Sequence, residues 1–186
     1  MSQARNQVRI IGGDYRRRQL PFPDAEGLRP TPDRVRETLF NWLGQELDGL
    51  NCLDLFAGSG ALGFEAASRR ARRVVMVEKS RKVAESLKAN RQLLAAQSVE
   101  VVVMDALHYL KSCRERFDLV FLDPPYRSEL LEQILPLLPA VLADDARVYA
   151  EAASWPGLDG WQRIKEGRAG LVHYGLLGRD RPDASL

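Results

Sequence analysis

Residues 53–63 read LDLFAGSGALG, in which an apolar run breaks into closely spaced glycines. This pattern predicts a buried strand that turns sharply into a helix. Gly58, Gly60 and Gly63 have the G-x-G-x-x-G spacing, which lets the backbone approach a ligand and leaves N–H groups at the helix start to receive an anion. The stretch therefore predicts a cofactor-binding turn, of the kind that nucleotides, flavins, nicotinamides and S-adenosylmethionine all use.

Asp54 lies inside the predicted strand, just ahead of these glycines. Its carboxylate would repel a phosphate-bearing cofactor, whereas the amino-acid end of S-adenosylmethionine offers an ammonium group for Asp54 and a carboxylate for the helix N-terminus. We therefore expect S-adenosylmethionine as the cofactor. The turn would hold it through Asp54, Phe56, Ala57, Gly58 and Gly60.

The positive charge of the chain is concentrated at its N-terminal end. The 186 residues suffice for one buried domain with a short appendage, but not for two full domains. Residues 1–20 hold five arginines and one aspartate, which gives them a net charge of +4. The whole chain carries +2, so the remaining residues carry −2. This asymmetry predicts an anionic partner, although arginines that only solvate a flexible terminus are the alternative. We divide the chain into a basic extension, residues 1–30, and a main domain, residues 31–186.

Cys52 and Cys113 are the only cysteines, and they stand in no metal-ligand spacing. The sequence therefore predicts neither a disulfide framework nor a metal site. Residues 1–9 lack an apolar run, and no stretch approaches the roughly 20 apolar residues of a membrane span. We expect a cytoplasmic protein with no membrane partner.

Two local patterns precede the glycine turn. Residues 8–11 and 15–20 flank a GGD turn and predict a small β-hairpin. Thr31 then predicts a helix N-cap, with a proline at the first helical position. The apolar positions of that helix share one face, which should pack on the core and leave Arg34 and Arg36 elsewhere.

From residue 51 onward, strands and helices alternate, as is typical of a parallel sheet covered on both faces. The expected strands are residues 52–57, 74–77, 99–104, 117–122 and 147–150. Residues 161–165 and 171–177 then predict an antiparallel hairpin. We therefore predict an α/β, Rossmann-like fold, with a mostly parallel seven-stranded sheet, a C-terminal antiparallel hairpin and a small N-terminal β-hairpin and helix extension.

Four acids come from four successive strands: Asp54, Glu78, Asp105 and Asp123. The carboxyl ends of the strands in an open parallel sheet form the ligand crevice, so these acids should surround one cleft. Any one of them could instead be a helix cap or loop residue.

Glu78 follows Gly58 by 20 residues, a spacing at which a carboxylate can accept hydrogen bonds from both ribose hydroxyls. A nicotinamide cofactor would use the same acid. Asp105 is placed to accept from an adenine amino group. We add the neighbouring Lys79 and Ala106 to the cofactor site.

The most specific motif is DPPY at residues 123–126. Its two prolines, Pro124 and Pro125, fix the backbone in an extended form without N–H donors, which holds the Asp123 side chain and the Pro124 carbonyl as acceptors. Tyr126 supplies an aromatic face. Acceptors beside a stacking ring suit an extruded base whose exocyclic amine is to be methylated, so we assign catalysis to these four residues and place Asp123 against the cofactor as well.

The DPPY motif after the fourth strand, with a glycine-rich loop after the first, resembles S-adenosylmethionine-dependent amino methyltransferases of class I. The closer resemblance is to the RsmD family, bacterial 16S ribosomal RNA guanine-N2 methyltransferases. It rests on four segments: RIIGG at 9–13, LRPT at 28–31, DRVRETLFNWL at 33–43 and LDLFAGSG at 53–60. The resemblance spans nearly the whole chain. It implies an enzyme that methylates the exocyclic N2 of a guanine in 16S ribosomal RNA.

The target base also has a physical interpretation. The neighbouring N1–H and N2–H₂ groups of guanine are both donors, which suit the acceptor-only carboxylate of Asp123, whereas adenine's mixed edge suits an asparagine better. One alternative is a nucleic-acid adenine-N6 methyltransferase. Another, of a different class, is a non-catalytic RNA-binding protein, which the intact cofactor acids and DPPY motif disfavour.

The expected partner is 16S ribosomal RNA, either free or within an assembled or partly assembled small ribosomal subunit. We expect the RNA backbone phosphates to contact a set of arginines: Arg16, Arg17, Arg18, Arg29 and Arg34. We expect the protein to act as a monomer.

Overall fold

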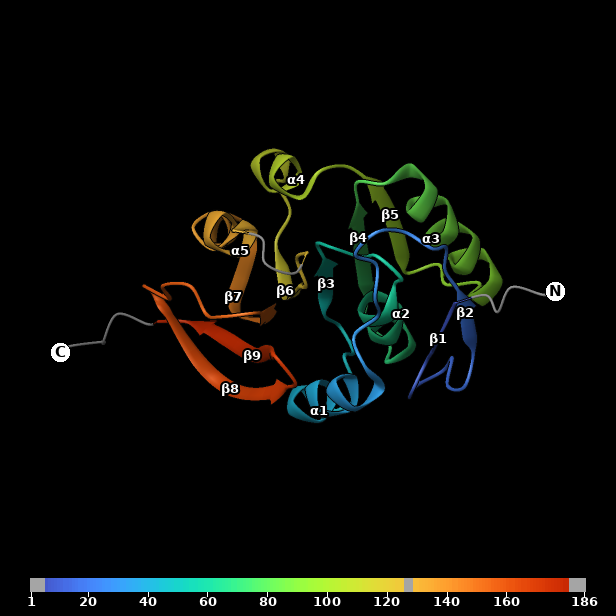
Figure 1. Cartoon of the computed structure of the whole chain (residues 1–186), viewed down its shortest axis with the longest axis horizontal. Helices are drawn as coiled ribbons and strands as arrows, with labels where there is room; N and C mark the ends of the chain where they lie inside the picture. Colours follow the sequence, from blue (N-terminus) through green and yellow to red (C-terminus); the bar gives the residue numbers. More distant parts are fainter. Residues whose placement is uncertain (1–5, 126–128, 181–186) are drawn as a thin grey trace.

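The computed structural model describes residues 6–125 and 129–180, so Tyr126 lies outside the described residues. The main sheet has seven strands in the order β5-β4-β3-β6-β7-β9-β8 (Figure 1). Its parallel strands are β3 (Asn51–Asp54), β4 (Arg73–Glu78), β5 (Val99–Val103), β6 (Phe117–Leu122) and β7 (Leu142–Ala152). The hairpin of β8 (Trp161–Ala169) and β9 (Val172–Arg179) adds to β7 in antiparallel fashion. The predicted fold is confirmed.

Helices cover both faces of the sheet. One face packs against α1 (Asp33–Leu43), α2 (Ala61–Ser68) and α3 (Arg81–Leu94), and the other against α4 (Ala106–Ser112), α5 (Leu130–Ile134) and the 3₁₀ helix Leu138–Val141. Figure 1 shows α4 and α5 on one side of the sheet and α1 and α2 on the other. Neighbouring residues of a strand face opposite layers, as Cys52 and Leu53 do.

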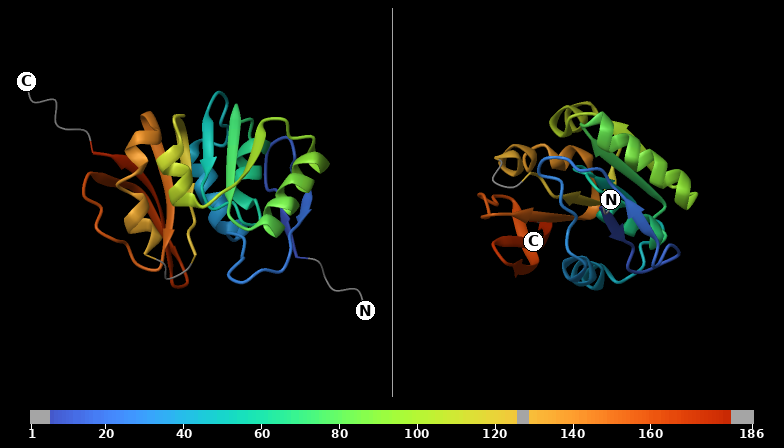
Figure 2. Two further views of the ribbon diagram at one scale, coloured as in Figure 1. Left: turned by 90° about the horizontal axis from the view of Figure 1, so that it is seen from above. Right: turned by 45° about the vertical axis from the view of Figure 1, so that its right-hand side comes forward.

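The N-terminal hairpin forms a separate two-stranded sheet of β1 (Gln7–Arg9) and β2 (Gln19–Pro21). Figures 1 and 2 place it at one end of the molecule and the β8–β9 hairpin at the other. The predicted hairpin is confirmed, but its second strand is shorter than residues 15–20 because Arg17 adopts a positive φ of 70° in the turn. Val8, Ile10 and Leu20 are buried in the same core as α1 and α2.

The start of α1 differs from the prediction. Pro32 occupies the N-cap position and makes no side-chain capping bond. The Thr31 hydroxyl instead donates a hydrogen bond to Glu151 Oε1 at 2.9 Å, because it faces a carboxylate across the end of the sheet. Thr31 therefore belongs to the cleft and not to the helix cap.

The predicted exposure of Arg36 is also wrong, because this side chain is buried with a counter-charge. Its Nη1 atom lies 3.4 Å from Glu65 Oε2, and Arg69 Nε lies 3.0 Å from the other oxygen of the same carboxylate. Glu65 further accepts hydrogen bonds from the backbone N–H groups of Ile11 and Gly12, both at 2.9 Å. This buried ionic cluster therefore fastens the N-terminal hairpin to α2.

The longest described helix, α3, has 14 residues. Across residues 6–125 and 129–180, every helix lacks the length or the apolar character needed to span a bilayer.

Candidate active site

Five acids form a row along the carboxyl edge of the parallel strands. The strand order β5-β4-β3-β6-β7 arranges them in space as Asp105, Glu78, Asp54, Asp123 and Glu151. Neighbouring strands are about 4.8 Å apart, so the row is on the order of 20 Å long. This length accommodates a nucleoside, its amino-acid tail and an acceptor base side by side.

Asp54 is the last residue of β3, and its side chain is buried. Its Oδ2 atom accepts a hydrogen bond from Gly63 N–H at 3.0 Å, whereas Oδ1 is buried with no hydrogen-bond partner of good geometry among the described residues. Burial raises the pKa of Asp54 to about 7, against the opposing effect of the Gly63 N–H, and the charge of Glu78 adds to the rise. A primary ammonium group beside Oδ1 would satisfy this atom and stabilise the carboxylate.

The glycine turn needs its glycines for two separate reasons. Gly58 and Gly60 both have positive φ, 52° and 84°, which side chains other than glycine rarely adopt. A Cβ atom on Gly60 would lie 2.5 Å from the Phe64 ring. The side chains of Ser59 and Asp54 accept hydrogen bonds from two of the N–H groups at the start of α2, those of Ala61 and Gly63. Phe56 and Ala57 lie in this turn, and Ala57 N–H donates to Val77 on β4.

Glu78 lies at the end of β4, and both of its carboxylate oxygens are oriented by backbone N–H groups. Gly58 donates to Oε2 at 3.0 Å and Ser80 donates to Oε1 at 2.9 Å. A carboxylate oxygen has a second lone pair, so each can still accept from a ribose hydroxyl. Lys79, next in the chain, is exposed.

Asp105 is exposed and forms the N-cap of α4, a helix that the sequence patterns did not predict. Its Oδ1 atom accepts from His108 N–H at 3.1 Å, and Ala106 is buried behind it. Asp105 can be both a helix cap and an acceptor for the adenine amino group, because the cap uses only one of its oxygens. The other oxygen can reach a ligand.

Asp123 lies beside a second carboxylate that was absent from the predicted site. Thr31 Oγ1 donates to Glu151 Oε1 at 2.9 Å and lies 3.5 Å from Asp123 Oδ2. The Tyr149 hydroxyl donates to the same Glu151 oxygen at 2.7 Å. Burial and the charge of Glu151 raise the pKa of Asp123 well above its ordinary value. Pro124 is half-buried and Pro125 exposed beside this pair.

A signal for Glu151 was present in the sequence. It follows the predicted strand 147–150 just as Glu78 follows the strand 74–77, and the rule that acids after parallel strands line the cleft applies equally to it. Thr31 and Tyr149 could not be found in this way, because their roles depend on contacts between distant segments.

The segment between β2 and α1 runs along the carboxyl edge of the sheet, over the row of five acids. Lys82 Nζ donates to the Asp24 carbonyl at 3.1 Å, which holds the segment against α3. A Cβ atom on Gly58 would lie 2.9 Å from Leu28 Cδ1, so Leu28 packs on the glycine turn. With Thr31 bound to Glu151, the segment therefore spans the edge from α3 to β7.

The sequence matches the family model described as conserved hypothetical protein 95 over residues 8–178. The Escherichia coli (strain K12) protein named ribosomal RNA small subunit methyltransferase D is 46% identical over 180 residues, which cover 94% of this chain and 91% of that protein. The chain belongs to the RsmD family. The family and the enzyme class predicted from the motifs, a methyltransferase, are thus confirmed.

Other similar proteins agree with this membership of the RsmD family. The Haemophilus influenzae protein of the same name is 44% identical over 182 residues, which cover 93% of this chain and 94% of that protein. The solved structure of the Escherichia coli protein yhhF has a TM-score of 0.87 and 44% identity, over 95% of this chain and 100% of that chain.

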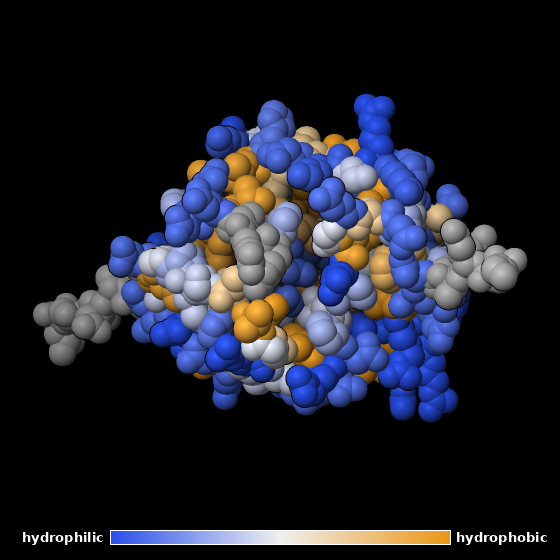
Figure 3. All heavy atoms as spheres, viewed as in Figure 1, coloured by the Kyte–Doolittle hydropathy of each residue, from blue (hydrophilic) through white to orange (hydrophobic). Residues whose placement is uncertain are grey.

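The five arginines predicted to contact RNA are all exposed in this member of the RsmD family, but they fall into two groups. Arg16, Arg17 and Arg18 lie in the turn of the N-terminal hairpin, and Arg18 Nη2 donates to the Leu93 carbonyl at 3.1 Å. Figure 3 shows strongly hydrophilic side chains projecting at the end where Figure 1 places this hairpin. Arg29 and Arg34 lie two residues before and three residues after Thr31, whose hydroxyl reaches Asp123.

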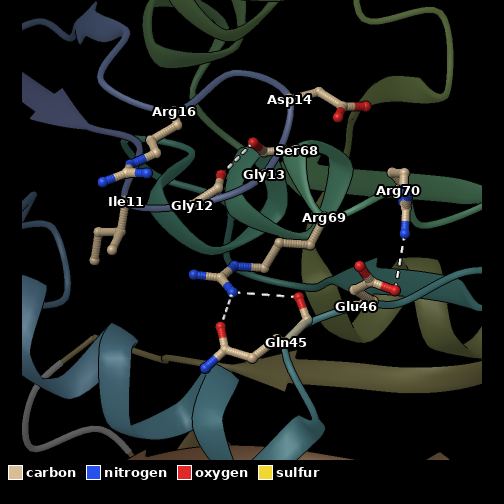
Figure 4. Close-up of a pocket in the computed structure, with 10 residues that line it drawn as sticks. All are labelled: Ile11, Gly12, Gly13, Asp14, Arg16, Gln45, Glu46, Ser68, Arg69 and Arg70. Atoms are coloured by element: carbon tan, nitrogen blue, oxygen red, sulfur yellow. Dashed lines mark hydrogen bonds and ion pairs between the residues drawn. The ribbon is translucent and has the colours of Figure 1, made fainter.

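A hollow of about 390 Å³ lies at the other end of α2 from the glycine turn (Figure 4). Arg69 crosses it and donates to both oxygens of Gln45, while Arg70 pairs with Glu46 at 2.8 Å. The hollow contains none of the five acids of the row. Two of its arginines, Arg69 and Arg70, are already paired with Glu65 and Glu46, so we assign the reaction to the carboxyl edge of the sheet.

Proposed function

We propose that this protein transfers a methyl group from S-adenosylmethionine to the exocyclic N2 of a guanine in 16S ribosomal RNA. One observation carries the proposal: the row of acids has the same order as the parts of a cofactor followed by a base. Asp105 would accept from adenine, Glu78 from the ribose and Asp54 from the ammonium group. Asp123, next in the row, would then face the acceptor base.

The cofactor would supply a methyl group bound to positively charged sulfur, and the chain supplies its binding groups. The buried Oδ1 atom of Asp54, which has no hydrogen-bond partner of good geometry among the described residues, fits a primary ammonium group. Glu78 is held rigidly by Gly58 and Ser80, so its oxygens need no reorganisation to accept two hydroxyls. Phe56, Ala57, Gly60, Lys79 and Ala106 complete the proposed site.

The acceptor base would meet residues 123–126. The ionised carboxylate of Asp123 and the Pro124 carbonyl present acceptors to the amine, which orients its lone pair and offsets the charge that develops on nitrogen. Pro125 stiffens the turn, and Tyr126 would stack on the base. An edge made only of acceptors suits guanine, whose N1–H and N2–H₂ groups are donors.

The proposed RNA contacts extend from the cleft to the N-terminal hairpin. Arg29 and Arg34, which flank Thr31 in the sequence, would bind phosphates beside the base site, while Arg16, Arg17 and Arg18 would bind phosphates further away. We propose that residues 1–30 serve as the RNA-contacting extension of a domain formed by residues 31–186. The protein would act as a monomer in the cytoplasm, on free 16S RNA or on the small ribosomal subunit.

The experiment that tests this function is nucleoside analysis after a methylation reaction. Unmodified 16S RNA and small subunits from a strain lacking the enzyme are incubated with the protein and S-adenosylmethionine, then digested and analysed by mass spectrometry. We expect N2-methylguanosine in at least one of the two substrates. N6-methyladenosine in its place would establish the adenine alternative, and binding without any methylation would establish a non-catalytic RNA-binding protein. The Asp123→Asn variant, which places an N–H₂ donor against guanine's own donors, should lose most of the product.

A further inference from the structure

The carboxyl groups of Asp123 and Glu151 are neighbours on adjacent parallel strands. β6 pairs with β7 through Leu122 and Ala150, so each acid directly follows the last residue that these two strands pair with each other. One hydroxyl group, that of Thr31, reaches both of them, at 3.5 Å from Asp123 Oδ2 and 2.9 Å from Glu151 Oε1. Two carboxylates in this arrangement repel each other, so a proton on the pair is stabilised.

The two members of the pair are held differently. Glu151 Oε1 accepts from the hydroxyls of Thr31 and Tyr149, at 2.9 and 2.7 Å. Tyr149 is fully buried and precedes Glu151 by two residues on β7, so both side chains face the same layer. Among the described residues, Asp123 accepts no short hydrogen bond from a hydroxyl: it has the 3.5 Å contact to Thr31 and an interaction with the carboxyl group of Glu151 itself. Glu151 is therefore the anchored member, and Asp123 is the member available to a substrate.

From this arrangement, we infer that Glu151 is a positioning residue that acts through Asp123 and makes it the acceptor of the proton released by the methylated amine. The inference rests on the proposed function and deepens it. It adds Glu151, Thr31 and Tyr149 to a reaction centre otherwise built from residues 123–126.

The chemistry requires such an acceptor. When the amine nitrogen forms its new bond to carbon with its lone pair, the electron pair of the broken sulfur–carbon bond stays on sulfur, and the positive charge moves to nitrogen. One N–H proton must then leave, and its bonding pair returns to nitrogen. An Asp123 oxygen takes that proton with a lone pair and forms an O–H bond, which is later lost to water. The products are a neutral methylated amine, a neutral thioether and a regenerated carboxylate.

The electrostatics agree with this assignment. Burial, and then the negative charge of Glu151, raise the pKa of Asp123 well above its ordinary value. Asp54, from β3, adds to the rise, and the hydrogen bond from Thr31, ahead of α1, opposes it. A carboxylate with a raised pKa is a stronger base, and its basicity lies closer to the optimum for proton transfer near neutral pH. Removal of the Glu151 charge must therefore weaken Asp123 as a base.

The first test measures Asp123 in the free protein, without cofactor or RNA. The carboxyl carbon of Asp123 is followed by NMR as a function of pH in the wild type and in Glu151→Gln, whose amide oxygen still accepts from both hydroxyls. We expect the wild-type signal to titrate in two steps, as coupled sites do, and the variant signal to move to lower pH. A single step at ordinary acidic pH in the wild type overturns the inference, and that measurement needs no variant to fold.

Tyr149→Phe is the matched control, because it removes one hydrogen bond to Glu151 without removing a charge. It should not lower the pH at which Asp123 titrates. If it lowers that pH as much as Glu151→Gln does, then the geometry of the network and not the charge of Glu151 governs Asp123, and the inference fails.

The second test uses single-turnover methylation of the RNA. For Glu151→Gln we expect the acid limb of the pH–rate profile to move to lower pH. We also expect the plateau rate to fall by about tenfold, which is less than the 10²- to 10⁴-fold rate enhancement that a general base contributes, because Asp123 itself remains. An unchanged plateau overturns the inference. A wild-type protein that forms no N2-methylguanosine overturns the proposed function instead, and the NMR titration distinguishes the two failures because it is independent of turnover.

Discussion

Asp54 Oδ2 accepts a hydrogen bond from the backbone N–H of Gly63 at 3.0 Å, which ties the last residue of β3 to the third residue of α2. The bond fixes the glycine turn between them and leaves Oδ1 as a buried atom without a hydrogen-bond partner of good geometry among the described residues. Burial raises the pKa of this carboxyl group to about 7. A proton and the cofactor's ammonium group should therefore compete for Asp54 near neutral pH.

The first prediction is that cofactor affinity rises with pH. Only the ionised form of Asp54 attracts an ammonium group, so binding strengthens as the pH rises through about 7. For one such group, affinity at pH 7 should be about fivefold higher than at pH 6. The amino group of S-adenosylhomocysteine is that of a free amino acid, whose own carboxylate keeps it protonated throughout this range. Calorimetric titration with S-adenosylhomocysteine between these values measures the effect.

The control for this prediction is Asp54→Asn, which keeps the size of the side chain and can still accept from Gly63. It should bind more weakly and show no change in affinity over the same range. A wild-type affinity that is flat with pH would mean that another group holds the ammonium.

A second prediction concerns Gly60, whose positive φ and close packing impose separate costs. Gly60→Ala meets the backbone strain of a left-handed residue, about 1 to 2 kcal/mol, and also a collision with the Phe64 ring at 2.5 Å. Gly170 has a φ of 60° with open space around it, so Gly170→Ala meets the strain alone. Urea denaturation should show a clearly larger loss of unfolding free energy for Gly60→Ala. Equal losses would show that Phe64 moves aside.

Much of the fold was predictable because local patterns and long-range packing agree. The glycine turn follows an apolar strand, and Ser80, a residue type that favours helix starts, caps α3 by accepting from Val83 N–H at 3.4 Å. The acids at the ends of β4 and β6 could be placed on one edge because parallel strands share the same direction.

The features that were not predicted depend on partners that are distant in the chain. Arg36 pairs with Asp33, three residues earlier, but its full burial also depends on the counter-charge of Glu65, 29 residues later. Thr31 leaves the helix cap because Glu151, 120 residues later, is a better acceptor for its hydroxyl. Periodicity assigns a face to a residue but cannot name such a partner. The periodicity of the apolar residues therefore identified α1 correctly, but the sequence misplaced Thr31 and Arg36.

The third prediction is that Glu65 is essential for stability. Its buried carboxylate is the counter-charge of both Arg36 and Arg69, and it also accepts from the backbone of the N-terminal hairpin. Glu65→Gln leaves two buried guanidinium groups without that charge, which should reduce the free energy of unfolding by about 3 to 5 kcal/mol. Glu85→Gln, on an exposed residue paired with Lys88, should change it by less than about 0.5 kcal/mol. Similar losses in the two variants would contradict the structural role of the cluster.

The last prediction tests whether the turn of the N-terminal hairpin binds RNA. Deleting the hairpin would remove Val8, Ile10 and Leu20 from the core, so substitution is the cleaner experiment. In Arg16→Ala/Arg17→Ala, both changes fall on exposed side chains.

Because each bound phosphate releases counterions, affinity for 16S RNA should fall, and the slope of log affinity against log salt should flatten by about 0.7 to 0.9 for each phosphate that the variant no longer binds. Binding of S-adenosylhomocysteine should not change. Arg163→Ala/Lys165→Ala removes the same charge from β8, at the opposite end of the sheet, and serves as the matched control. A flatter slope for the hairpin variant alone assigns a local RNA-binding role to Arg16 and Arg17. An equal change in both variants would mean that the RNA responds to the overall charge of the protein, and the arginines of the turn would then be solvating residues.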